Sequence, residues 1–95
     1  MTTATQILCR AADLMEERGK QYDAKEGERS MDKTVAAFNT LTGHELSAAD
    51  GFLLLTVLKI VRDQQRQQAH QDSCEDLVAY ASLYAETRLN ETEKD

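Results

Sequence analysis

Residues 52–61 read Phe-Leu-Leu-Leu-Thr-Val-Leu-Lys-Ile-Val, so a helix formed by them would carry apolar side chains on nearly every side. A helix that is apolar all round has to be covered by other parts of a protein. The run is too short for a membrane span, and Lys59 interrupts it. Ser47 stands at the position of an N-cap, with Asp50 three residues later as in a capping box. We therefore expect this helix to be the central one of a small bundle.

The rest of the chain carries three further helical patterns. Apolar residues recur at helical spacing from about Thr3 to Arg18, with Thr2 or Thr3 as the cap. The same spacing predicts a second helix over about Met31–Leu41. The last helix begins with a cap at Asp72 or Ser73 and ends near Arg88.

A long connection is expected between the first and second helices. Residues 19–30 contain two glycines and many charges. Gly19 would end the first helix in the left-handed conformation, and Ser30 would cap the second. Tyr22 either packs its ring onto the bundle or belongs to a functional loop. Gly43 is expected to end the second helix.

These patterns predict an all-α fold, a compact bundle of about four helices with a central apolar third helix. The chain has no proline and only four glycines in 95 residues, which favours helices over a sandwich or barrel of many turns. Residues 1–89 are expected to form a single helical domain. Residues 90–95 are an acidic tail without an apolar residue, and we expect this tail to fray.

Charge and composition limit the partners. The chain has 11 basic and 17 acidic residues, and a net charge of −6 argues against nonspecific nucleic-acid binding. The same charge either keeps the protein soluble or docks it on a basic partner protein. There is no signal peptide, no apolar run that could span a membrane, and no metal-ligand spacing around the two cysteines, so we expect a cytoplasmic protein with free thiols. We expect a homodimer through the first helix and the third or fourth, because it would bury apolar surface that four helices leave uncovered.

Polar residues of the third and fourth helices fall on two faces that can meet. Lys59 and Arg62 are three residues apart and share a face of the third helix. Asp72, Asp76 and Tyr80 are four residues apart and share a face of the fourth. Because the connection between these helices is short, we expect the helices to be antiparallel neighbours and the two faces to come together.

Two arrangements of this polar cluster are open. In the first it is a structural ion-pair cluster, because Lys59 in an apolar helix needs an anionic partner to keep its charge. In the second it is a polar pocket whose cations hold phosphate, or whose carboxylates Asp72 and Asp76 hold a divalent metal. His70 lies at the rim in either arrangement.

Three strings of the chain carry a family resemblance: Glu17-Arg18-Gly19-x-x-Tyr22, Lys59-x-x-Arg62 and His70-x-Asp72-Ser73-x-x-Asp76-x-x-x-Tyr80. From about Ile7 to Ala85 the chain resembles small proteins of bacteriophages and prophages, a family without an assigned function. The family pattern has glycine and tryptophan where this chain has Asp23 and Phe38. The resemblance implies a phage accessory protein in the host bacterial cytoplasm. Such a protein would bind a host macromolecule or a nucleotide without catalysis, for example to counter a host defence.

A more distant resemblance suggests an enzyme instead. The string from Asp72 to Asp76 is similar to the second acidic motif of the all-helical MazG-type nucleoside triphosphate pyrophosphohydrolases, which implies Mg²⁺ at these two carboxylates. Those enzymes have a second acidic pair on the preceding helix, where this chain has Lys59 and Arg62. We therefore expect no catalysis and no cofactor, and Mg²⁺ only in this alternative. The residues expected to form the polar pocket or ion-pair cluster are Arg18, Tyr22, Lys59, Arg62, His70, Asp72, Asp76 and Tyr80.

Overall fold

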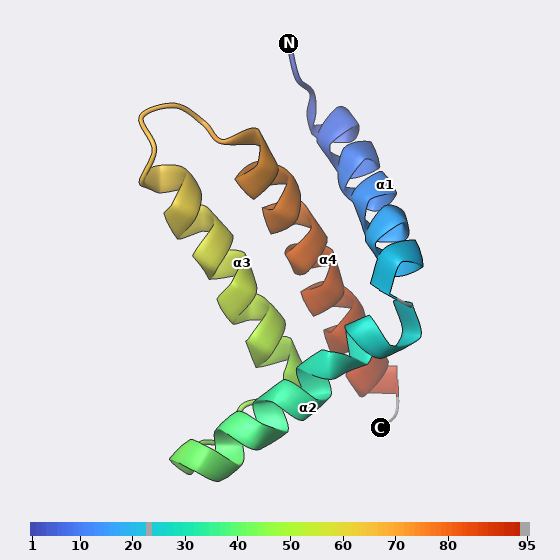
Figure 1. Ribbon diagram of the computed structural model, residues 1–95, viewed down its shortest axis with the longest axis vertical. Helices are drawn as coiled ribbons and strands as arrows, with labels where there is room; N and C mark the ends of the chain where they lie inside the picture. The colour runs from blue at the N-terminus through green and yellow to red at the C-terminus, as the bar shows by residue number, and fades with distance from the viewer. Residues whose placement is uncertain (23, 94–95) are drawn as a thin grey trace.

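A computed structural model describes residues 1–22 and 24–93, with side chains for residues 1–18 and 30–91. These residues form four helices: α1 (Ala4–Tyr22), α2 (Ala24–Thr42), α3 (Ala48–Gln64) and α4 (Gln71–Glu93). In Figure 1, α3 and α4 lie side by side and antiparallel, and α1 lies along the other side of α4. α2 contacts α1 and α3, and it crosses α3 near the start of that helix. The predicted all-α bundle of four helices is confirmed. None of the helices formed by the described residues has a stretch long and apolar enough to cross a membrane.

Reciprocal side-chain caps start two of the helices; Ser47 with Asp50 was predicted as such a pair, and Thr3 was one of the two caps predicted for the first helix. Before α1, Thr3 Oγ1 accepts from the Gln6 N–H (3.1 Å), and Gln6 Oε1 accepts from the Thr3 N–H (2.9 Å). Before α3, Ser47 and Asp50 exchange the same two bonds at 3.1 and 2.9 Å, which is a capping box. Gly43 follows the end of α2 with φ +78°, a conformation that favours glycine.

The predicted long connection over residues 19–30 is wrong. α1 continues to Tyr22 and α2 begins at Ala24, so Gly19 does not end a helix and Ser30 lies inside one. Most residues of this segment are good helix formers, and one glycine inside a helix costs only about 1 kcal/mol relative to alanine. The side chain of Tyr22 lies outside the described residues, so its predicted place in the cluster stays a prediction.

α4 begins earlier and ends later than predicted. It starts at Gln71, ahead of the expected cap, and His70 takes the capping role because the Ser73 N–H donates to His70 Nδ1 (3.3 Å). The helix ends at Glu93 rather than near Arg88, so the backbone of the predicted frayed tail is helical up to that residue. The rest of the tail lies outside the described part of the chain.

The surroundings of α3 differ from the expectation of a covered, central helix. α4 contacts both α3 and α1, whereas α3 contacts α4 and α2, so α4 lies in the middle of the layer (Figure 1). The buried residues of α3 are Ala49, Gly51 and Phe52. Six large apolar side chains of α3 remain 38–64% exposed: Leu53, Leu54, Val57, Leu58, Ile60 and Val61. The two helices that contact α3, α2 and α4, do not suffice to surround it.

Small residues let the helices approach closely. The buried apolar residues are Ala11, Val35, Ala49, Phe52 and Ala79. At the α2–α3 crossing, a Cβ added to Gly51 would collide with Met31 Sδ and lie 3.0 Å from Val35 Cγ1. The absence of a side chain at Gly51 therefore leaves room for Met31 and Val35 of α2 at this crossing. This crossing lies at the opposite end of α3 from the connection to α4 (Figure 1).

Candidate functional site

Asp76 joins three helices through its carboxylate. Its Oδ2 lies 3.1 Å from Lys59 Nζ on α3, and its Oδ1 lies 3.1 Å from Arg18 Nη2 on α1. The side chains of Lys59 and Asp76 are 14% and 13% exposed, whereas that of Arg18 is 49% exposed. The structure therefore forms the predicted pair between α3 and α4, and it brings Arg18 to the same carboxylate.

Tyr80 lies one helical turn after Asp76 and faces the same cation. The Lys59 Nζ atom is 6.0 Å from the centre of the Tyr80 ring, at the outer limit of a cation–π contact. Lys59 is thus compensated by an anion and an aromatic face, as a charge on a largely apolar helix requires. The predicted neighbourhood of these three residues is present.

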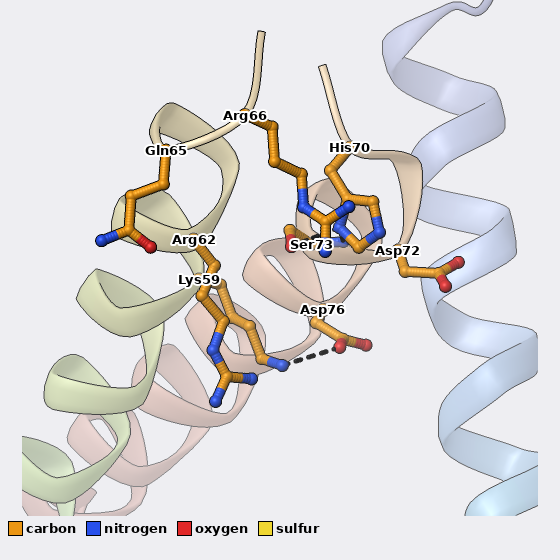
Figure 2. A pocket seen from close by; sticks show the side chains of 8 residues that line it. All are labelled: Lys59, Arg62, Gln65, Arg66, His70, Asp72, Ser73 and Asp76. Carbon is orange, nitrogen blue, oxygen red and sulfur yellow. Dashed lines mark hydrogen bonds and ion pairs between the residues drawn. The ribbon is translucent and has the colours of Figure 1, made fainter. Parts of the chain in front are cut away.

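Arg62 and Asp72 do not join this ion pair, which is where the cluster differs from the predicted one. In Figure 2 the carboxylate of Asp72 points away from Lys59, toward the side on which α1 lies. Positions four apart on a helix are offset by about 40°, and this offset turns Asp72 away from α3 while Asp76 faces it. Among the described residues, neither Arg62 nor Asp72 has an ion-pair partner.

A pocket of about 530 Å³ lies between the end of α3 and the start of α4 (Figure 2). Its lining residues are Lys59, Arg62, Gln65, Arg66, His70, Asp72, Ser73 and Asp76. Sequence reasoning missed Gln65, Arg66 and Ser73 as members of this group. A signal for Arg66 was present, because it follows Lys59 by seven residues and Arg62 by four, which is one helical face.

The cations of the pocket are only partly neutralised. Lys59 is paired with Asp76, but neither Arg62 nor Arg66 forms an ion pair in the part of the chain that the structure describes. The whole protein carries a net charge of −6, so these arginines form a local basic region on an acidic molecule. Such a region attracts anions to one place on the surface.

Asp63 fixes the rim of the pocket where the chain turns from α3 to α4. Its Oδ1 accepts from the His70 N–H at 2.7 Å. His70 Nδ1 lies 2.7 Å from Ser73 Oγ and also accepts from the Ser73 N–H at 3.3 Å. Since Nδ1 is an acceptor, the neutral ring carries its proton on Nε2. His70 and Ser73 are therefore joined to each other in the lining that they share with Arg62 and Arg66.

Cys74 lies behind this rim and is not a nucleophile candidate. Its Sγ lies 3.7 Å from Asp63 Oδ1. Burial, followed by the neighbouring Asp63 carboxylate, raises the pKa of the Cys74 thiol. Because the thiolate is the reactive form, a raised pKa makes this cysteine less reactive than an ordinary one.

The donor set does not fit the Mg²⁺ that the MazG-type resemblance implies. Asp76 already contacts two cations, and Asp72 points away from the Lys59 side of the pocket. Across residues with described side chains, no group of three or more His, Cys, Asp or Glu residues could hold a metal ion. Magnesium generally needs carboxylates that are free to coordinate it.

Comparison with known proteins assigns a family but no activity. No curated protein and no solved structure matches the chain. One family model matches residues 6–88, which is most of the chain. The description of that family names neither a phage origin nor a pyrophosphohydrolase. The chain therefore belongs to the family described as Domain of unknown function (DUF6378).

Proposed function

We propose that this protein binds a phosphorylated small molecule, such as a nucleotide, in the pocket between α3 and α4 without catalysing a reaction on it. The observation that carries the proposal is the pair Arg62 and Arg66, which line the pocket without a carboxylate partner in the described part of the chain. A guanidinium group presents two parallel N–H donors that match the geometry of phosphate oxygens. Two arginines without an ion pair among the described residues favour an anionic ligand over a neutral one.

Other features of the pocket support a phosphate ligand. The first turn of α4 contributes Ser73 to the lining, and the dipole of a helix attracts anions to the start of that helix. His70 adds a second polar side chain at the rim. A volume of about 530 Å³ falls within the range of roughly 300–1,000 Å³ that is usual for small-molecule sites. Lys59 is held in place by Asp76 and adds a third cation to the lining.

The resemblance to small bacteriophage proteins supports a biological context for this binding. We propose that the protein acts in the cytoplasm of the host bacterium as a phage accessory protein. It would sequester a nucleotide or present it to a host protein, and so counter a host defence. We also propose that it acts as a homodimer, for which an interface is argued below.

An alternative function is that of a MazG-like, Mg²⁺-dependent nucleotide pyrophosphohydrolase. The string from Asp72 to Asp76 on an all-helical chain favours it, and both residues line the same pocket. The two cations on Asp76 weigh against it, because a carboxylate engaged by Lys59 and Arg18 is a poor metal ligand. The two functions differ in whether the ligand is hydrolysed.

The test is isothermal titration calorimetry with pyrophosphate, a panel of nucleoside triphosphates, and the unphosphorylated nucleosides. Arg62→Gln and Arg66→Gln should each weaken binding roughly tenfold or more, since a hydrogen bond to a charged group contributes about 1.5–3 kcal/mol. Lys33→Gln removes one positive charge from the exposed surface of α2 and serves as the matched control. Nucleosides without phosphate should bind weakly or not at all.

Two results would contradict the proposal. Equal affinities for the wild type and both arginine variants would show that the pocket is not the binding site. Release of pyrophosphate from a nucleoside triphosphate that requires Mg²⁺ and is lost in Asp76→Asn would favour the enzymatic alternative. A control reaction without protein in the same Mg²⁺ buffer excludes background hydrolysis.

A further inference from the structure

We infer that the uncovered face of α3 binds the same face of a second copy of this chain, with the two α3 helices antiparallel. This α3 face consists of Leu53, Leu54, Val57, Leu58, Ile60 and Val61. All six side chains are substantially exposed, and they lie on the edge helix of the layer in Figure 1. Contiguous apolar surface of this kind marks an interaction site on most proteins.

The amount of exposed surface supports a partner of substantial size. The chain exposes 7491 Å². A folded monomer of 10.7 kDa is expected to expose about 5,500 Å². The difference exceeds the roughly 800 Å² per partner that a standard protein interface buries. The radius of gyration, 14.6 Å, is also larger than the value of about 12 Å expected for a compact chain of this length.

The spacing of the α3 face matches that of helix–helix seams. Leu54, Val57 and Val61 are separated by three and then four residues, which is the spacing of core positions in a coiled coil. The other three side chains of the α3 face flank this seam. Lys59 is the only charged residue within 53–61, and it is turned to Asp76 rather than to the open face. The α3 face is therefore an uncharged stripe about 12 Å long.

The residues at the two ends of the stripe favour the antiparallel orientation. Asp50 precedes Leu54 by four residues and Gln64 follows Val61 by three, so both continue the seam. A parallel pair would bring the two exposed Asp50 carboxylates together. An antiparallel pair separates them and brings each toward the end of the other α3, where the seam continues with the uncharged Gln64. A two-fold axis through the stripe makes this contact self-complementary, which is how most homodimers close.

A second copy explains the α3 face better than an unrelated protein, because the stripe and its ends are self-complementary. The exposed leucines of the other helices, such as Leu8 on α1 and Leu89 on α4, are separate from the stripe in sequence. The inference concerns a different surface from the pocket lining and does not depend on phosphate binding. A monomer in solution would leave the phosphate-binding proposal standing, and a failure to bind phosphate would leave the dimer inference standing.

The first test measures mass in solution. Sedimentation equilibrium of the full chain at about 100 µM should give twice 10.7 kDa. Leu54→Glu with Val61→Glu should give the monomer mass. Leu8→Glu is the control and should remain a dimer, because Leu8 lies on α1, outside the stripe. It is matched to Leu54 in exposure, at 59% against 64%. Circular dichroism of each variant checks that the helices are retained.

The second test measures orientation and does not require a charged substitution in the stripe. A nitroxide label at Gln64→Cys, with Cys9→Ser and Cys74→Ser, reports the distance between copies by pulsed electron paramagnetic resonance. In the antiparallel dimer the two labelled positions should be about 20 Å apart along the helix axis if the two-fold passes through the centre of the stripe. In a parallel dimer they would be at the packing distance of about 8–10 Å.

Three results would overturn the inference. The first is a monomer mass for the wild type at 100 µM. The second is a dimer that survives the two glutamate substitutions with its helices intact. The third is a label separation at the packing distance. If the glutamate variant does not fold, the mass of the wild type and the label distance decide the question between them.

Discussion

The ammonium group of Lys59 on α3 lies 3.1 Å from the carboxylate of Asp76 on α4, and both side chains are largely buried. Removing two charges from water costs several kcal/mol, and only close pairing repays that cost. The Arg18 guanidinium on α1 contacts the other oxygen of the same carboxylate. One aspartate therefore contacts cations from two other helices, and it lies in the lining of the pocket.

Removing one partner of this pair should destabilise the fold strongly. Lys59→Met leaves the largely buried Asp76 with only the half-exposed Arg18 as a partner, and we expect a loss of up to about 3–5 kcal/mol in the free energy of unfolding. Lys59→Met combined with Asp76→Leu should recover much of that loss, because apolar replacement of both partners is often close to neutral. Urea unfolding of the wild type, both single variants and the double variant gives the coupling. Near-zero coupling together with lost pyrophosphate binding would instead mean that Lys59 is a hydrated ligand group.

The contact of Arg18 with Asp76 should contribute far less. About half of the Arg18 side chain is exposed, so water and salt screen its charge. Arg18→Gln should cost at most about 1 kcal/mol, and the cost should shrink further in 1 M NaCl. Urea unfolding at low and high salt measures both values. A cost comparable to that of Lys59→Met would contradict this ranking of the two cations.

Local signals in the sequence predicted the features that depend on a few neighbouring residues. Ser47 with Asp50, and Gly43 with its positive φ, follow from capping and backbone rules that act within one turn. The pair Lys59 and Asp76 could be predicted because helical spacing and a short connection fix which faces of α3 and α4 meet. Segment 19–30 was not predicted to be helical, because two glycines and many charges are typical of a connection, yet the helix propensity of the neighbouring residues prevails.

Other features depend on the tertiary arrangement and were not accessible from spacing alone. Arg10 on α1 lies 3.6 Å from the buried carboxylate of Glu75 on α4, and no pattern along the chain relates these two residues. Apolar residues on all sides of α3 indicate that other helices pack against it. They do not indicate whether those helices belong to the same chain or to a second one. For the pocket, the direction of Asp72 depends on a small angular offset between neighbouring helical positions, which a same-face rule ignores.

The capping box of α3 should be a measurable source of stability. Ser47→Ala removes the oxygen that accepts from the Asp50 N–H, and it should cost about 0.5–2 kcal/mol in the free energy of unfolding. Thr2→Ala is the control, because the hydrogen bonds before α1 are made by Thr3 rather than by Thr2. Thermal unfolding of both variants compares the two. Equal melting temperatures for Ser47→Ala and the wild type would show that the cap contributes nothing.

The thiol of Cys74 should make the protein less stable as the solution becomes alkaline. Burial and the Asp63 carboxylate raise its pKa in the folded state above the ordinary value of 9.0. Below that value the thiol is protonated in both the folded and unfolded states, so stability does not depend on it. As the pH rises through 9.0, the unfolded chain releases the proton first, and the free energy of unfolding falls until the folded thiol also ionises.

Thiol alkylation can isolate this effect from other groups that titrate at high pH. In a Cys9→Ser variant, the rate of Cys74 alkylation should reach half of its maximum at a higher pH in the folded protein than in urea. Asp63→Asn should move the folded half-point only partway back, because burial is the larger cause and remains. Asparagine keeps the oxygen that accepts from the His70 N–H, so the rim should stay in place. Identical half-points in native buffer and in urea would show that the Cys74 site does not favour the neutral thiol.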